Sequence, residues 1–114
     1  MKTILFRLDY GENFGGGHLS RCLILAKDLQ RKFQIIFNIQ VKSKRNKYSC
    51  KKLILKNLNK KVKIFFLKNL NINNELKLHK KLNAKFKISK IIFDFANIEK
   101  TKLKSNLANY FDKL

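Results

Sequence analysis

The sequence predicts an α/β domain, with a Rossmann-like parallel sheet of about four strands and helices on both faces. The chain has 114 residues, the size of a single unit, so we expect one domain over residues 1–114. Hydrophobic residues make up 45% of it, enough for a buried core. Short apolar runs of β type alternate with segments of helical periodicity, an order typical of parallel strands joined by right-handed crossovers.

The expected strands are short apolar runs rich in Ile, Leu and Phe. They cover residues 3–8, 33–41, 62–67 and 90–95. Continuous apolar runs of this length are typical of strands that are buried on both faces of a sheet.

The expected helices have apolar residues spaced three or four apart, which places them on one helix face. The first covers residues 18–32, with its apolar face formed by Leu19, Cys22, Leu23, Ala26 and Leu29. A polar loop at 42–47 precedes the second, over residues 48–58, with a buried face formed by Cys50, Leu53, Ile54 and Leu58.

Two further helices are expected later in the chain. Asn73 and Asn74 suit the N-cap of the third, whose apolar face is marked by Leu78, Leu82 and Phe86. His79 lies among its lysines, so we expect a solvated side chain and no metal ligand. The apolar residues of the last helix are Leu103, Leu107, Tyr110, Phe111 and Leu114.

The net charge of +20 comes from 27 basic and 7 acidic residues and has two open explanations. One is a surface selected to bind polyanions. The other is codon bias, because Lys, Asn and Ile have AT-rich codons and Pro, which has GC-rich codons, is absent. The lysines are scattered along the chain. We therefore expect no nucleic-acid partner, while an anionic membrane surface stays open.

The compartment follows from cysteines and hydropathy. Cys22 and Cys50 form neither a disulfide framework nor a zinc quartet, and both are expected to be core residues without thiol chemistry. No apolar run approaches the roughly 18 residues of a membrane span. Arg7 follows too closely on the N-terminus for the apolar stretch of a signal peptide. We expect a protein of the reducing cytoplasm.

All four glycines lie in one window between the first strand and the first helix: Gly11, Gly15, Gly16 and Gly17. Ligands of open α/β sheets bind at the carboxyl ends of strands, where glycine permits close approach and the helix offers free N–H groups. The spacing fits neither G-x-G-x-x-G nor a P-loop. The alternative is a tight turn that binds nothing.

His18 follows this window directly and opens the helix. A helix N-terminus disfavours the imidazolium form, so we expect a neutral ring that can accept a proton from water or a hydroxyl group. Arg21 lies three residues on, on the same helix face, where it can hold a carboxylate or phosphate. The alternative is that His18 only caps the helix and Arg21 is solvated.

These residues resemble the N-terminus of the pseudaminic acid pathway's UDP-2,4-diacetamido-2,4,6-trideoxy-β-L-altropyranose hydrolases and the related spore-coat polysaccharide biosynthesis proteins. The family pattern is R-x-D, a short loop, G-x-G-H-x-x-R and L-A-x-x-L. It matches Arg7-x-Asp9, residues 15–21 and residues 25–29. The run 91–94, IIFD, resembles the family's later strand that ends in Asp. Peptidoglycan N-acetylglucosaminyltransferases have a similar G-G-H turn, but usually proline in place of Arg21.

The resemblance implies a GT-B-like fold of two Rossmann-like halves. The implied reaction is hydrolysis of the bond between the anomeric carbon and the UDP oxygen, releasing UDP and a free diacetamido sugar without metal or cofactor. By resemblance, His18 is the catalytic residue that activates water. The implied substrate-binding residues are Asp9, Gly15, Gly16, Gly17, Arg21 and Asp94.

The family's C-terminal half, which holds most uridine diphosphate contacts, has no counterpart in this sequence. We expect a truncated or split member that is inactive alone and that a separately encoded C-terminal half completes. Two alternatives stay open. One is a fragment of a GT-B UDP-sugar glycosyltransferase; the other is a basic module that binds nucleic acid or a membrane surface.

Overall fold

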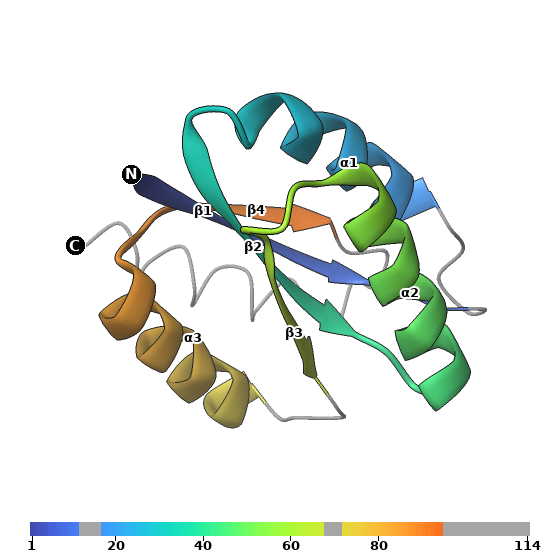
Figure 1. Cartoon of the computed structure of the whole chain (residues 1–114). Coiled ribbons are helices and arrows are strands. Elements are labelled where there is room, and N and C mark those ends of the chain that lie inside the picture. The colour runs from blue at the N-terminus through green and yellow to red at the C-terminus, as the bar shows by residue number, and fades with distance from the viewer. Residues whose placement is uncertain (12–16, 68–71, 95–114) are drawn as a thin grey trace.

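Strands and helices alternate along the chain (Figure 1). A computed structural model of the protein describes residues 1–11, 17–67 and 72–94. The elements in chain order are β1 (Lys2–Asp9), α1 (Gly17–Leu29), β2 (Phe33–Gln40), α2 (Lys44–Asn57), β3 (Lys63–Leu67), α3 (Ile72–Phe86) and β4 (Ile88–Asp94). The four strands form one parallel sheet in the order β3-β2-β1-β4. The predicted α/β fold with a four-stranded parallel sheet is confirmed.

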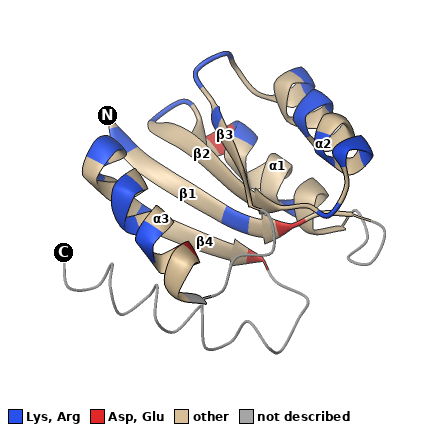
Figure 2. Cartoon of the chain, turned by 90° about the horizontal axis from the view of Figure 1, so that it is seen from below, with Lys and Arg blue, Asp and Glu red and all other residues tan. Residues whose placement is uncertain are grey.

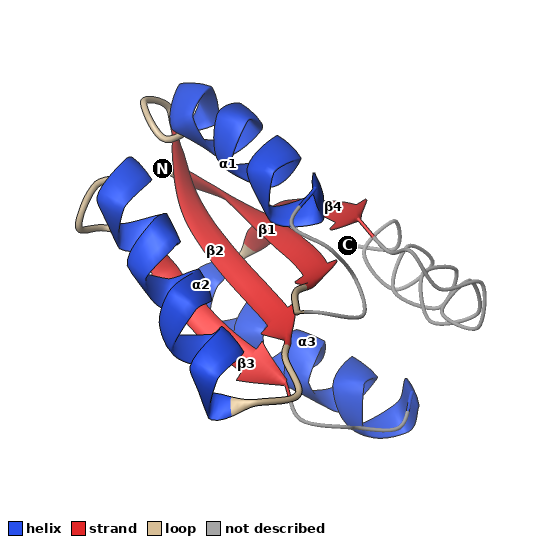
Figure 3. Ribbon diagram, turned by 90° about the vertical axis from the view of Figure 1, so that its right-hand side faces the viewer, coloured by secondary structure: helices blue, strands red, loops and turns tan. Residues whose placement is uncertain are grey.

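The helices cover both faces of the sheet, as the sequence predicts. Figures 1 and 3 show α1 and α2 on one face and α3 on the other. The strand order explains this, because β1, β2 and β3 step across the sheet in one direction while the chain returns from β3 to β4 in the other. Right-handed crossovers in opposite directions place their helices on opposite faces.

Each face of the sheet buries its own apolar cluster, because side chains alternate between the two faces of a strand. Beneath α1 and α2, the cluster contains Ile4, Phe6, Leu8, Ile35, Phe37 and Ile39 from the two central strands. The rings of Phe6 and Phe37 stack there with centroids 5.1 Å apart. The smaller cluster beneath α3 is formed by Leu5, Ile36, Leu82 and Ile88.

Helix α2 begins earlier than predicted, and part of its expected buried face is exposed. Its first residue is Lys44, inside the segment expected as a loop. Ser43 is the N-cap, and its hydroxyl accepts a hydrogen bond of 3.1 Å from the backbone N–H of Asn46. Serine is among the residues preferred at this position, so the sequence held a local signal for the earlier start. Leu53 was expected in the core but is 41% exposed.

The connection from α3 to β4 also differs from expectation. Helix α3 begins at Ile72, so Asn73 and Asn74 lie within its first turn instead of capping it. Strand β4 begins at Ile88 instead of residue 90, because Lys87 alone links it to α3. Lys87 has a φ of 53°, the left-handed conformation that commonly ends a helix, although glycine usually provides it. Residue 95 and the predicted last helix lie outside the described residues.

A buried ion cluster joins β1 to α3. Arg7 is fully buried, and its guanidinium donates two hydrogen bonds to Glu75, from Nε to Oε2 at 3.0 Å and from Nη2 to Oε1 at 2.9 Å. Its Nη1 donates to the carbonyl of Leu8 at 2.7 Å and to Oδ1 of Asp9 at 3.1 Å. Removing one partner of such a buried pair is strongly destabilising, because it leaves an uncompensated charge.

His79 belongs to this cluster, so the prediction that it is solvated is wrong. The side chain is fully buried, with Nε2 3.3 Å from Oε2 of Glu75 and 2.9 Å from Nδ2 of Asn38. Glu75 and His79 are four residues apart and therefore share the inward face of α3. The neighbouring lysines at 77, 80 and 81 are exposed on the outward face.

None of the helices within the described ranges is long and apolar enough to cross a lipid bilayer.

We expect Glu75 to stabilise the fold at neutral pH and to lose this effect in acid. Burial raises the pKa of Glu75, but hydrogen bonds from His79 and Arg7 outweigh it and lower the pKa from 4.5 to about 2. A lowered carboxyl pKa stabilises the native state above pH 4.5, and the contribution disappears as the pH falls to about 2. Glu75→Gln should therefore lower the free energy of unfolding by about 3 kcal/mol at pH 7.

Urea unfolding of both proteins over this pH range measures the effect. The wild-type advantage should be constant above the ordinary carboxyl pKa and shrink below it. An advantage that does not change with pH would contradict the assignment.

Candidate functional site

The candidate site lies at the carboxyl ends of β1 and β4. These strands are neighbours, but the chain leaves β1 over one face, towards α1, and reaches β4 from the other face, after α3. Ligands of open α/β sheets bind at such a switch point, outside the carboxyl ends of the strands. Figure 2 shows the acidic ends of β1 and β4 together at this edge. The register pairs Leu8 of β1 with Asp94, the last residue of β4.

Three side chains meet there and form what we call the His18–Asp94–Arg21 cluster. His18 and Arg21 come from the first turns of α1, and Asp94 comes from the end of β4. Nδ1 of His18 is hydrogen-bonded to Oδ1 of Asp94. Arg21 donates to the same carboxylate, from Nη2 to Oδ1 at 3.1 Å and from Nε to Oδ2 at 3.3 Å. The side chains of His18 and Asp94 are 11% and 19% exposed, whereas that of Arg21 is 63% exposed.

The contact with Asp94 favours one tautomer of His18. A carboxylate accepts hydrogen bonds but does not donate them, so Nδ1 holds the hydrogen in the contact with Asp94. The neutral ring then has its lone pair on Nε2. Burial raises the pKa of Asp94, but hydrogen bonds from Arg21 and His18 outweigh it and bring the pKa below its ordinary value. Asp94 is therefore charged at neutral pH.

The guanidinium of Arg21 lies close to the backbone of Gly17. A Cβ atom on Gly17 would lie 3.1 Å from Nη1 of Arg21, closer than ordinary van der Waals contact. Its Nη2 lies 3.0 Å from Nδ1 of His18. It adds a fixed positive charge to a helix N-terminus that already favours anions.

The predicted site residues fall into three groups. Gly17, His18, Arg21 and Asp94 come together as described. Gly15 and Gly16 lie outside the described residues, and their role stays a prediction. Asp9 is fully buried and paired with Arg7 on the α3 face, and its expected contact with substrate also stays a prediction.

The partners of Asp9 were not predicted from the sequence. These partners belong to the buried ion cluster, which holds the end of β1 against α3 and contains Arg7, Glu75 and His79. The available signal was the spacing of Glu75 and His79, four residues apart, which places two hydrogen-bonding side chains on one helix face.

The cysteines are core residues, as predicted. Cys22 and Cys50 are both buried. Burial, and next the charge of Asp94, raise the pKa of Cys22 to about 12. Burial alone raises the pKa of Cys50 to about 12. Both thiols are therefore protonated at neutral pH and are poor nucleophiles.

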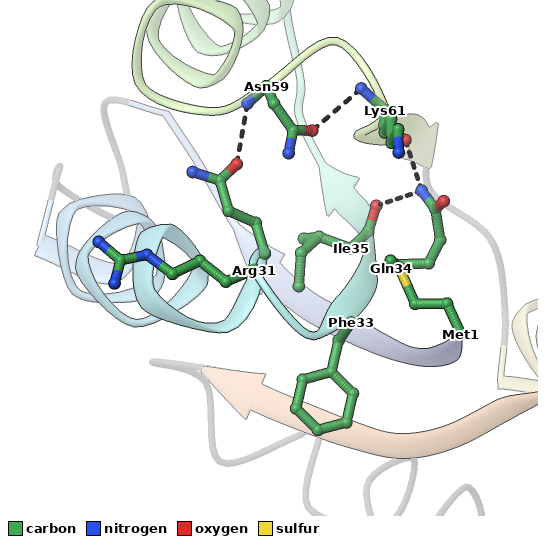
Figure 4. A pocket seen from close by; sticks show the side chains of 8 residues that line it. Met1, Arg31, Phe33, Gln34, Ile35, Asn59 and Lys61 are labelled. Atoms are coloured by element: carbon green, nitrogen blue, oxygen red, sulfur yellow. Dashed lines mark hydrogen bonds between the residues drawn. The ribbon is translucent and has the colours of Figure 1, made fainter.

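Cavities among the described residues also lie away from the cluster. One, of about 250 Å³, lies at the amino ends of the strands, near the start of β2 (Figure 4). It is lined by Met1, Gln30, Arg31, Phe33, Gln34, Ile35, Asn59 and Lys61. The amide of Gln34 donates to the carbonyl of Lys61 there, and Oε1 of Gln30 accepts from the N–H of Asn59 at 2.8 Å. Another, of about 400 Å³, lies beside the start of α2. Within the described ranges, no group of three His, Cys, Asp or Glu side chains is placed to hold a metal ion.

Comparison with known proteins supports the fold. No protein-family model and no curated protein matches the sequence. A solved structure described as Phytolacca americana UGT2 complexed with UDP-2fluoro-glucose and pterostilbene matches with a TM-score of 0.57 and 15% identity. The match covers 95% of this chain and 29% of the plant chain, so this chain spans less than a third of that protein. At this identity the likeness shows a GT-B-like α/β domain and nothing finer.

We expect Asp94 to control the tautomer of His18. In the wild type the hydrogen should reside on Nδ1, and in Asp94→Ala the population should shift towards Nε2–H, because the acceptor is gone. NMR of the side-chain nitrogens of histidine distinguishes the two forms. His79 lies on the other face of the sheet and is an internal control that should not respond. An unchanged His18 tautomer in Asp94→Ala would show that the pair does not orient the ring.

Proposed function

We propose that the His18–Asp94–Arg21 cluster is the reaction centre of a nucleotide-sugar hydrolase. The observation that carries this proposal is the hydrogen bond between Nδ1 of His18 and Asp94 at the switch point of the sheet. A histidine held by a carboxylate is a common arrangement for a general base. The resemblance of residues 15–21 to UDP-sugar hydrolases and the GT-B-like fold support the same substrate class.

The proposed reaction begins with proton transfer from water to Nε2 of His18. As this O–H bond of the water breaks, the water oxygen attacks the anomeric carbon of the sugar. The bond between that carbon and the β-phosphate oxygen breaks, and the electron pair leaves with UDP. Asp94 stabilises the imidazolium that forms, and Arg21 offsets negative charge on the leaving diphosphate. The products are UDP and a free sugar.

We further propose that a second domain supplies most of the nucleotide contacts. The matched plant protein is more than three times as long as this chain. The described site provides a base and a cation, which act on the sugar–phosphate bond but do not enclose a nucleotide. The second domain would close over the carboxyl edge of the sheet and exclude bulk water.

A glycosyltransferase is the second candidate. The matched plant structure is described as a complex with UDP-2fluoro-glucose and a second organic molecule, pterostilbene. The same histidine could take a proton from an acceptor hydroxyl instead of water. The two functions differ in their product, because a hydrolase releases free sugar and a transferase attaches the sugar to an acceptor.

The proposed function predicts that His18 is required for turnover. The purified chain would be mixed with the C-terminal half of a complete UDP-sugar hydrolase, and UDP and free sugar would be measured with a diacetamido UDP-sugar. His18→Ala should lower kcat by about 10²–10⁴-fold, the usual contribution of a general base. Lys32→Ala, an exposed change just beyond α1, should have no effect.

Three results would count against parts of this proposal. A His18→Ala variant at the wild-type rate would eliminate the base. Full turnover by the chain alone would eliminate the need for a second domain. Release of UDP only when an acceptor is added, without free sugar, would favour the transferase.

A further inference from the structure

Exposed apolar side chains gather on one side of the molecule. Within the described residues, the exposed large hydrophobic side chains are Met1, Ile24, Leu25, Tyr48, Leu53 and Leu55. All except Met1 lie on α1 or α2, which together cover one face of the sheet. Ile24 and Tyr48 are 72% and 70% exposed. Large apolar side chains that cluster on a surface are typical of contact sites for another apolar body.

These side chains fall into two groups on the two helices. Ile24 of α1 and Leu53 of α2 line the same groove, of about 380 Å³, between the helices. Tyr48 and Leu55 are seven residues apart, so they lie two turns apart on one stripe of α2. At about 100° per residue, this stripe lies on the flank of α2 opposite Leu53, whereas the groove lies on the flank that faces α1. Lys52 and Lys56 lie between the two flanks, on the side of α2 away from its buried residues Cys50 and Ile54.

Basic residues occupy the space between the apolar ones. Helix α2 carries six Lys and Arg residues and no Asp or Glu. Lys52 lies four residues after Tyr48, and Lys56 three residues after Leu53, so each is a direct neighbour of an apolar side chain on the helix surface. Lys52 and Lys56 are both exposed. We call Ile24, Tyr48, Lys52, Leu53, Leu55 and Lys56 the α1–α2 outer surface.

We propose that the α1–α2 outer surface binds an anionic lipid bilayer. Amphipathic helices with lysines beside exposed aliphatic and aromatic side chains bind the interface of such membranes, where the lysines meet lipid phosphates and the apolar groups enter the acyl boundary. Nucleic acid would explain the lysines but leave Ile24, Leu53 and Leu55 in water. The contact is peripheral and goes beyond the proposed chemistry, since the His18–Asp94–Arg21 cluster lies at the carboxyl edge of the sheet.

Co-sedimentation with lipid vesicles tests the proposal on the full chain. The vesicles are phosphatidylcholine alone or phosphatidylcholine with one-third phosphatidylglycerol, and we expect binding to the second kind. The double variant Lys52→Ala/Lys56→Ala should lower the partition coefficient by about fivefold for each lysine. Ile24→Ser/Leu53→Ser should lower it by at least about tenfold at unchanged net charge. Circular dichroism would show that each variant is folded.

The matched control removes the same charge from the opposite face. Lys77 and Lys81 are exposed on α3, so Lys77→Ala/Lys81→Ala lowers the net charge equally without touching α1 or α2. This variant should bind nearly as well as the wild type. If it loses as much affinity as the α2 variant, the attraction is only that of a chain with net charge +20.

Other results would also overturn the proposal. One is the absence of binding to phosphatidylglycerol vesicles. A second is wild-type binding by Ile24→Ser/Leu53→Ser together with competition by double-stranded DNA, which would show a phosphate-binding surface instead. A third is a stable dimer in sedimentation analysis that Ile24→Ser/Leu53→Ser disrupts, which would assign the surface to a second copy of the chain.

Discussion

The position of β1 in the sheet is the constraint from which the site follows. Because β1 lies between β2 and β4, the chain leaves its end over one face and approaches β4 from the other. The first turn of α1 and the last residue of β4 therefore arrive at the same edge. His18 and Asp94 are separated by 76 residues along the chain, yet they form one hydrogen-bonded pair. Without this strand order, the imidazole would have no carboxylate to orient it.

The two faces of the sheet differ in the interactions that hold their helices. The α1–α2 face is sealed by aliphatic and aromatic side chains, so its helices are held mainly by apolar burial. The α3 face has a smaller apolar cluster at one end and the buried ions at the other. Arg7 holds the end of β1 against α3 through its hydrogen bonds to Glu75. The same guanidinium donates to the carbonyl of Leu8 and to the carboxylate of Asp9, at the end of β1. His18 thus belongs to a helix on one face of the sheet, and the buried ion cluster lies on the other face.

Much of the fold could be predicted from the sequence because apolar runs and helical spacing are local patterns. The proximity of Gly17, His18 and Arg21 could be predicted for the same reason, since they are close in sequence at the start of one helix. Asp94 was found only through a resemblance, because parallel pairing with β1 leaves no local signal. The prediction for His79 was wrong because the neighbouring lysines indicated solvent, whereas its burial depends on packing against Asn38, which comes from a strand distant in the sequence. The early start of α2 could have been predicted locally, because Ser43 is a preferred N-cap residue.

The most direct measurement is amide chemical-shift mapping of the chain during titration with a UDP-sugar such as UDP-N-acetylglucosamine. A ligand at the switch point should move the signals of Gly17, His18, Arg21 and Asp94 most, and the shifts at these positions should shrink in Asp94→Ala. Saturating shifts confined to the start of α2 or to the amino-terminal edge near Gln34, with none at His18, would place the ligand elsewhere and contradict a reaction centre built on the His18–Asp94 pair.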